Sequence, residues 1–131
     1  MIYSLVVLAG PATDVPRRAL RFAQALLSRG HSLRRVFFLD DGVQCGLATA
    51  VPAQDELNQL DEWRKLTHKT QTELVVCISS ALRRGVLDGP EAERHERLAT
   101  TLDAAFSIGG LGLLVEAATD SERLITFGGR R

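Results

Sequence analysis

The 131-residue sequence contains few cysteines and histidines, and those it has are not arranged as a metal site. Cys45 and Cys77 lie far apart, whereas zinc sites use closely spaced pairs of ligands. His31, His68 and His95 each stand alone. We therefore expect no metal. Two cysteines without a partner nearby are typical of a protein from a reducing compartment.

The sequence also lacks a long apolar run and an excess of charge of either sign. No apolar stretch approaches the roughly 18 residues that a membrane-spanning helix needs. Sixteen basic and 16 acidic side chains balance, which removes the electrostatic reason for direct binding to nucleic acid or anionic membranes. Residues 1–10 are apolar but have no leading Lys or Arg, so we expect a strand rather than a signal peptide. The predicted location is the cytoplasm.

Familiar catalytic and cofactor-binding motifs are absent. The sequence has no Gly-x-Ser-x-Gly elbow, no Walker loop and no acidic pair spaced for hydrolysis. Residues 109–112 are glycine-rich, but Val115 stands where a dinucleotide-binding motif would have its last glycine. This spacing favours a tight turn with close helix packing. We expect no cofactor.

Apolar strand patterns alternate with amphipathic helix patterns along the whole chain. Strands are predicted at residues 2–9, 33–39, 73–79, 106–108 and 123–127. Helices are predicted before Gly30, from Asp55 to about Lys69, from Pro90 within a polar segment reaching about Ala105, and after Gly112. This alternation predicts one α/β domain over residues 1–131, with a frayed tail at 128–131. The expected architecture is a flavodoxin-like three-layer fold: a mostly parallel sheet of about five strands with helices on both faces.

Two segments are predicted to form contact surfaces with other chains. Residues 43–54 form an irregular loop in which Val43, Leu47 and Val51 look exposed. Residues 88–100 are polar, with few apolar anchors. Asp40 and Asp41, which precede the loop, are expected to complete a turn rather than act as an acid or base.

The segment 73–86 is the strongest candidate for chemistry. An apolar, β-branched run predicts a buried strand, and Cys77 ends it just before a short helical segment closed by Arg83 and Arg84. Backbone N–H groups at a helix start favour a thiolate, and the two arginines would add positive potential if they folded back. An inert core cysteine fits the same pattern. Because Cys77-Ile-Ser-Ser80 lacks a resolving cysteine, any chemistry would be that of a one-thiol carrier.

Several ordered blocks resemble the DsrE/TusD family of small sulfur-relay proteins, over nearly the whole chain. They are Gly10-Pro11; Phe22–Leu26 with Gly30-His31; Val36–Phe38 with Asp41–Val43; Trp63; Val76-Cys77 with Ala81–Val86 and Asp88; Ser107, Gly110–Gly112 and Glu116-Ala117; and Arg123–Phe127. The cysteine block is the most specific. Cys45 departs from the family pattern, and Ser79-Ser80 stands where members often have alanines.

The resemblance implies that Cys77 is catalytic and belongs to a sulfurtransferase. Such a subunit accepts sulfane sulfur as a persulfide from a TusA-like carrier and passes it to a TusE-like acceptor, on the route to 2-thiouridine at the tRNA wobble position. It would assemble with TusB-like and TusC-like subunits as a heterohexamer, a dimer of heterotrimers, without binding tRNA itself. A DsrE-like subunit of a DsrEFH-type complex in dissimilatory sulfur oxidation is the alternative. A non-catalytic scaffold or thiol-redox module is an alternative of another class.

Overall fold

Five parallel strands form one sheet, in the order β4-β3-β2-β1-β5, in the computed structural model, which describes residues 1–129. The strands are β1 (Ile2–Val7), β2 (Ser32–Phe38), β3 (Glu73–Cys77), β4 (Phe106–Gly109) and β5 (Arg123–Phe127). The helices are α1 (Val15–Ser28), η1, a 3-10 helix (Asp40–Gly46), α2 (Gln59–Thr70), α3 (Ile78–Arg83), α4 (Gly89–Arg94) and α5 (Leu111–Asp120). The predicted α/β fold with a five-stranded parallel sheet is confirmed.

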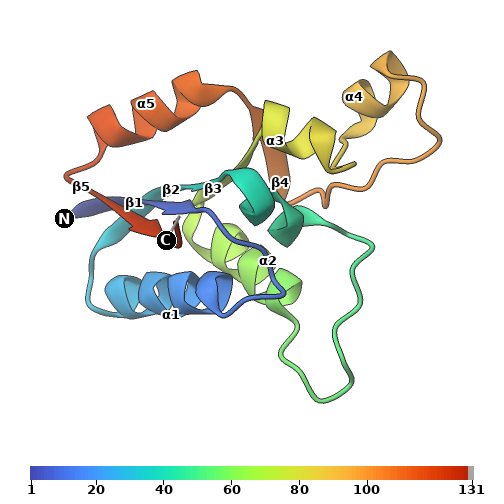
Figure 1. Cartoon of the computed structure of the whole chain (residues 1–131). Helices are drawn as coiled ribbons and strands as arrows, with labels where there is room; N and C mark the ends of the chain where they lie inside the picture. Colours follow the sequence, from blue (N-terminus) through green and yellow to red (C-terminus); the bar gives the residue numbers. More distant parts are fainter. Residues whose placement is uncertain (130–131) are drawn as a thin grey trace.

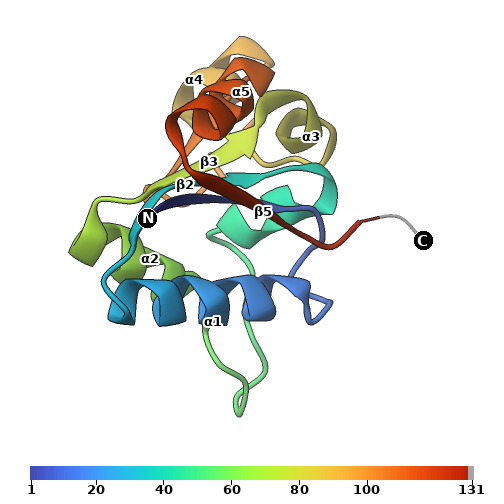
Figure 2. The ribbon, with the colours of Figure 1, turned by 90° about the vertical axis from the view of Figure 1, so that its left-hand side faces the viewer.

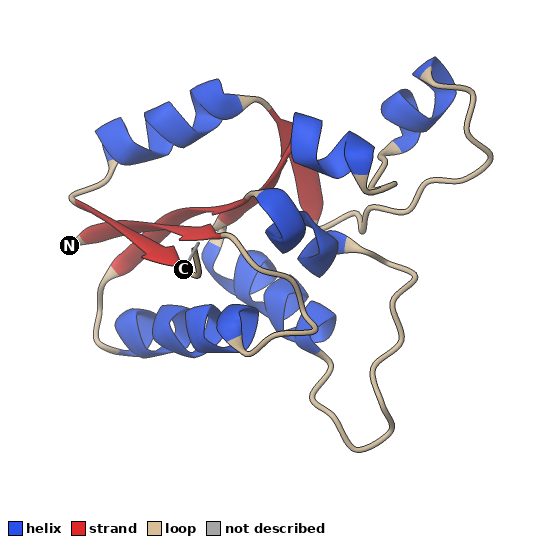
Figure 3. Ribbon diagram, viewed as in Figure 1, coloured by secondary structure: helices blue, strands red, loops and turns tan. Residues whose placement is uncertain are grey.

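Helices cover the two faces of the sheet unequally. Figures 1 and 2 show α1 and α2 along one face, and α5 and α3 along the other, with α4 beyond α3. Figure 3 shows that long loops connect η1 to α2 and α4 to β4. The larger apolar core, which includes Trp63, lies on the side of α1 and α2. A small cluster of Phe37, Val75 and Cys77 lies on the other side, against leucines of α5.

Charged side chains fasten α5 to the sheet. Arg35 of β2 is 2% exposed, and its guanidinium donates to the carbonyl of Leu113 at 2.9 Å. The same guanidinium contacts the carboxylates of Glu73 at 3.0 Å and Glu116 at 3.2 Å. A buried arginine is tolerated only where such partners surround it. The polar contacts therefore hold a helix whose apolar contribution to the core is small.

The ends of the helices and strands match some of the predicted boundaries and differ from others. Asn58, not Asp55, caps α2, because its side chain accepts the N–H of Asp61 at 3.2 Å. Leu57, which falls inside the predicted helix, precedes α2 and is 52% exposed. Gly30 has φ +85° and ends the first helix segment as expected. The strand β3 ends two residues before residue 79, since α3 follows immediately.

The predicted helix starting near Pro90 exists but is short. Asp88 caps α4 by accepting the N–H of Glu91 at 2.9 Å, and Pro90 lies in the first turn. The helix ends at Arg94, because the backbone is left-handed at Glu96, with φ +54°. The polar chain from there to β4 is not helical, so the expected reach toward residue 105 is wrong.

The predicted irregular loop 43–54 is partly ordered. Its first residues belong to η1, where Val43 is fully buried and Cys45 is 5% exposed, so the expected exposure of Val43 is wrong. Leu47 is half-buried, and Val51 is 89% exposed as expected. Only the second half of the segment therefore presents apolar side chains at the surface.

A close backbone approach holds η1 against the end of β1. The N–H of Leu39 donates to the carbonyl of Val7 at 3.0 Å. A Cβ atom added to Gly42 would lie 2.1 Å from that carbonyl oxygen, a separation that real Cβ atoms do not show. Glycine is therefore required at residue 42 by proximity rather than by its backbone angles.

Two further sequence expectations concern the membrane and the chain end. Among residues 1–129, no helix combines the length and the apolarity that crossing a bilayer would require. The predicted frayed tail, 128–131, lies partly outside the described residues.

Replacing Gly42 with alanine should destabilise the fold. The added methyl group must push η1 away from β1, at a cost of about 1–3 kcal/mol in the free energy of unfolding. Chemical denaturation measures the change. Gly112→Ala is the matched control: nothing lies within 4 Å of its added Cβ, and alanine favours helix, so stability should be unchanged or about 0.5 kcal/mol higher. Equal stability of the two variants would contradict the close approach.

Candidate functional site

Cys77 lies at the carboxyl end of β3, on the edge of the sheet where sites form in parallel α/β folds. It is the last residue of the strand, pairs in register with Gly109 of β4, and precedes α3 directly. The turns after two other strands share this edge: η1 begins at Asp40 after β2, and Gly10 follows β1. A Cβ on Gly10 would lie 3.0 Å from the carbonyl oxygen of Asp41. The strand-end turns are thus packed together.

The sulfur of Cys77 is nearly enclosed. The residue is 2% exposed and belongs to the small cluster with Phe37 and Val75. Leu113 and Leu114 of α5 pack against this cluster. On the other side, Sγ lies 3.5 Å from the hydroxyl oxygen of the exposed residue Ser79. The sulfur is therefore close to the surface beside a serine, and shielded elsewhere by apolar side chains.

The pKa of the Cys77 thiol is lowered from its ordinary value of 9.0. Burial is the largest single influence and raises the pKa, because it disfavours the charged thiolate. The nearby polar groups of Ser79 and Ser80 together outweigh burial and lower the pKa, and of these the Ser79 hydroxyl lies 3.5 Å from Sγ. Because the thiolate is the nucleophilic form of cysteine, the site favours attack on an incoming sulfur.

Of the two arginines expected to activate Cys77, Arg84 contacts other groups and Arg83 is exposed. Arg84 donates through Nε to Asp41 Oδ1 at 2.8 Å, and through a guanidinium nitrogen to the carbonyl of Ser80 at 3.1 Å. Arg83 is exposed. Neither arginine is among the groups that chiefly shift the pKa of Cys77. Ser79 and Ser80, rather than the arginines, lower the pKa of Cys77. The sequence signal was the polar Ser79-Ser80 pair that follows the cysteine.

Ser80 joins the cysteine to the neighbouring strand end. Its side-chain oxygen accepts the backbone N–H of Asp40 at 3.0 Å. Asp40 adopts a left-handed backbone, with φ +52°, an uncommon conformation for a residue other than glycine. Together with the ion pair between Arg84 and Asp41, this hydrogen bond ties η1 to α3 at two points.

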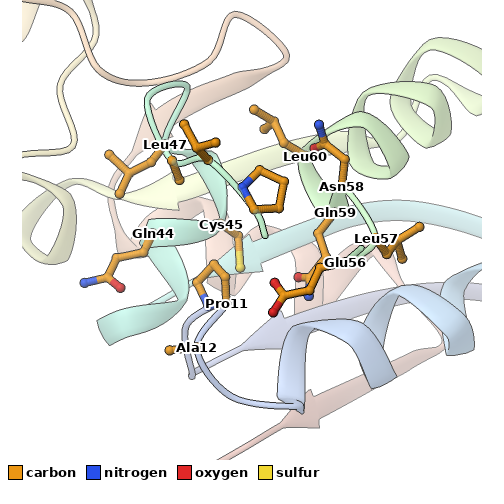
Figure 4. A pocket seen from close by; sticks show the side chains of 13 residues that line it. Pro11, Ala12, Gln44, Cys45, Leu47, Glu56, Leu57, Asn58, Gln59 and Leu60 are labelled. Atoms are coloured by element: carbon orange, nitrogen blue, oxygen red, sulfur yellow. The ribbon is translucent and has the colours of Figure 1, made fainter. Parts of the chain in front are cut away.

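Cys45 lies in a different environment from Cys77. It is 5% exposed and belongs to the larger core, on the side of α1 and α2. Burial raises the pKa of its thiol to about 12. Figure 4 shows its sulfur directed toward Pro11, in a pocket of about 240 Å³ beside segment 56–60. The structure therefore does not bring the two cysteines together, and the pocket holds the less reactive one.

The other candidate features have structural roles. The glycines at 109–112 form the turn into α5, where a Cβ on Gly109 would lie 2.3 Å from the Leu113 side chain. Glycine therefore permits close helix packing there. Within residues 1–129, no group of three or more His, Cys, Asp or Glu side chains is placed to hold a metal ion.

The chain is similar to known proteins over nearly its whole length. The profile of the DsrE/DsrF-like family matches residues 1–127. The chain is 44% identical to "Sulfurtransferase TusD homolog" of Pseudomonas aeruginosa over 131 residues, all of both chains. It is 39% identical to "Putative sulfurtransferase DsrE" of Allochromatium vinosum, over 98% of this chain and 99% of that one.

Solved structures share the fold at lower sequence identity. The crystal structure of the ychN protein from E. coli superimposes with a TM-score of 0.75 at 20% identity, covering 96% of this chain and 97% of that one. That likeness concerns the fold alone. With the family profile spanning nearly every residue and relatives similar over their full lengths, the chain belongs to the DsrE/DsrF-like family.

Proposed function

We propose that this chain is a sulfurtransferase subunit that carries sulfane sulfur as a persulfide on Cys77, in a relay toward 2-thiolation of the tRNA wobble uridine. The observation that carries the proposal is a cysteine with a lowered thiol pKa at the carboxyl edge of the sheet. It occurs in a chain that is 44% identical, end to end, to a protein named for sulfur transfer. Residues 1–131 would act as one domain.

The chemistry needs one thiol and no external oxidant. The Cys77 thiolate attacks the outer sulfur of a donor persulfide; a bond forms between the two sulfurs, and the donor leaves as a thiolate. In the second step an acceptor thiolate attacks that outer sulfur. The Cys77–sulfur bond then breaks, its electron pair stays on Cys77 Sγ, and the acceptor holds the persulfide. One sulfur atom moves with no net oxidation or reduction.

The separation of the two cysteines favours a carrier over a disulfide redox module. Cys45 and Cys77 belong to core clusters on opposite faces of the sheet. The high pKa of Cys45, about 12, also keeps its thiol protonated at neutral pH. A resolving reaction within the chain would require both thiols at one place. The scaffold alternative makes no use of the lowered pKa of Cys77.

The proposed partners are those that the family resemblance implies. TusD-like proteins are expected to assemble with TusB-like and TusC-like subunits as a dimer of heterotrimers, to load from a TusA-like donor and to deliver to a TusE-like acceptor. The chain would act in the cytoplasm, and its zero formal net charge agrees with the absence of direct tRNA binding. The second candidate function is a DsrE-like role in dissimilatory sulfur oxidation, favoured by the 39% identity to the DsrE protein.

Alkylation should distinguish the two cysteines in the folded protein. Cys77 should react with iodoacetamide well before Cys45, because its thiol pKa lies below 9.0 while burial raises that of Cys45 to about 12. Mass spectrometry of the digested protein identifies the labelled residue. In denaturant both should react alike. Equal rates in the folded protein would contradict the assigned difference in acidity.

Sulfur loading tests the carrier function directly. The chain with its TusB-like and TusC-like partners is incubated with a cysteine desulfurase, cysteine and a TusA-like carrier. Intact-mass measurement should show a gain of one sulfur on the wild type and on Cys45→Ala, but none on Cys77→Ser. Absence of loading on the wild type in the assembled complex would sink the proposal.

Complementation tests whether the chain acts in tRNA thiolation or in sulfur oxidation. In a bacterium lacking its TusD protein, the wild-type chain should restore 2-thiouridine in tRNA, measured by nucleoside mass spectrometry, and Cys77→Ser should not. Co-expression with the chain's own TusB-like and TusC-like subunits controls for failed assembly. Loading of Cys77 without any restoration of 2-thiouridine in that setting would favour the sulfur-oxidation role.

A further inference from the structure

The first half of α5 covers the small cluster that contains Cys77. Leu113 and Leu114 pack against this cluster. Leu113 also lies against the end of β4, since a Cβ added to Gly109, the residue paired with Cys77, would lie 2.3 Å from the Leu113 side chain. Figure 1 shows the chain entering α5 directly from β4. The start of α5 is therefore placed over the strand ends beside the cysteine.

Attack at Sγ requires part of this enclosure to move. Cys77 is 2% exposed, whereas an incoming reagent must bring its reacting atom into contact with the sulfur. Two of the surrounding elements, β2 and β4, pair with β3 in the sheet. A third, α3, is tied to η1 by a hydrogen bond of Ser80 and an ion pair of Arg84. The remaining element is α5.

The apolar anchorage of α5 is slight. Of the ten residues of this helix, Ala117 is the buried one, while Leu111 and Val115 are 57% and 64% exposed. Gly110 precedes the helix and has no side chain to cap it. A Cβ on Gly110 or Gly112 would meet nothing within 4 Å, and glycine leaves the backbone free to change direction. The entry to α5 is therefore both flexible and unconfined.

The other end of α5 is fixed to the sheet. The hydroxyl oxygen of Ser121, which follows the helix, lies 2.7 Å from that of Ser4, a fully buried residue of β1. The N–H of Glu122 donates to the carbonyl of Ile2 at 2.8 Å. A helix held at this end and flexible at the other can swing, and its first turn then moves most.

Four charged side chains hold the middle of α5 against the sheet. Arg35 donates to the carbonyl of Leu113 at 2.9 Å and contacts Glu116 at 3.2 Å. Arg34 contacts Glu116 at 2.9 Å and Asp120 at 3.2 Å. We call Arg34, Arg35, Glu116 and Asp120 the clasp. Because both of its carboxylates are about half exposed, at 46% and 47%, their ion pairs break and re-form at low cost.

We propose that α5 is a movable cover over Cys77, and that the clasp sets how often the first turn of α5 lifts away from the sulfur. Glu116 is then a positioning residue, since it acts on Cys77 through Leu113 and Leu114 and touches no reacting atom. The consequence for sulfur transfer rests on the proposed function. The cover must lift before the outer sulfur of a donor persulfide reaches Sγ, so a weaker clasp should speed loading.

Alkylation of both cysteines in one folded chain tests the cover without a sulfur donor. In Glu116→Ala, iodoacetamide should label Cys77 about fivefold faster than in the wild type, which is the loss of two ion pairs of modest strength. Cys45 should keep its wild-type rate, because it lies in the larger core on the opposite face and reports openings of the whole fold. Alanine favours helix, so the substitution does not weaken α5 itself. Mass spectrometry of the digested protein gives both rates.

The labelling rate of Cys77 is measured against pH, because the removal of a carboxylate also changes the local charge. A changed thiol pKa moves the midpoint of this profile, whereas freer access raises the plateau that is reached once the thiol is ionised. The plateau should rise in Glu116→Ala. It should rise less in Glu116→Gln, whose amide oxygen can still accept a hydrogen bond from an arginine.

Two further variants bracket the effect. Glu62→Ala removes an exposed contact on the opposite face, that with Lys65 of α2 at 3.7 Å, and should leave the Cys77 plateau unchanged. Gly112→Ala stiffens the first turn of α5 and should lower the plateau by about twofold. Hydrogen exchange followed by mass spectrometry should be faster in α5 of Glu116→Ala than in the wild type, and equal in α1.

The outcomes separate this inference from the proposed function. An unchanged Cys77 plateau in Glu116→Ala would overturn the movable cover even if the carrier protein loads Cys77, since the sulfur would then be reached past Ser79 instead. Equal acceleration of Cys77 and Cys45 would also overturn it, because the whole fold would then be opening. A raised plateau for Cys77 alone would support the cover even if desulfurase-dependent loading fails.

Discussion

The contact between Gly42 and the carbonyl of Val7 is the constraint on which the carboxyl edge of the sheet depends. Because no side chain separates the two backbones, η1 lies directly on the end of β1. In that position Cys45 is buried on one face of the sheet, and the first residue of η1, Asp40, hydrogen-bonds to Ser80 of α3. The environment of Cys77 is thus determined partly by a glycine on a different strand connection.

The two faces of the sheet divide stability and chemistry. The face under α1 and α2 contains most of the apolar core, including the aromatic contact of Phe38 with Trp63 at 5.3 Å between ring centroids. The face under α5 has a small apolar cluster and a buried arginine held by carboxylates. The thiol of Cys77 lies on the face with the small cluster, near the surface. Its strand, β3, is held by the larger core on the opposite face.

Local sequence patterns predicted most of the fold, because continuous β-branched runs and strong helix patterns need little tertiary context. They also placed Cys77 at the correct strand end. Choices between similar local signals were harder: both Asp55 and Asn58 can cap a helix, and the structure places the cap at Asn58. A single short 3-10 helix leaves no clear periodicity, so the burial of Val43 was missed.

The activating groups at Cys77 show the same limit. Sequence proximity suggested Arg84, but that side chain pairs with Asp41, a residue far away in the chain. The serines were visible as an unusual polar pair, yet only the fold reveals that Ser80 also meets the Asp40 amide. Contacts between distant strand ends decide where Arg84 and Ser80 find their partners, and no local pattern encodes these contacts.

The near-complete enclosure of Cys77 has a consequence for oxidative damage. Conversion of a thiolate to sulfenic acid and beyond requires an oxidant to reach Sγ, and at 2% exposure that approach is hindered. In the proposed persulfide, the outer sulfur would stand about 2 Å from Sγ, given a typical sulfur–sulfur bond length. The empty thiol would then be less accessible than the outer sulfur of the loaded carrier, which any incoming reagent would meet first.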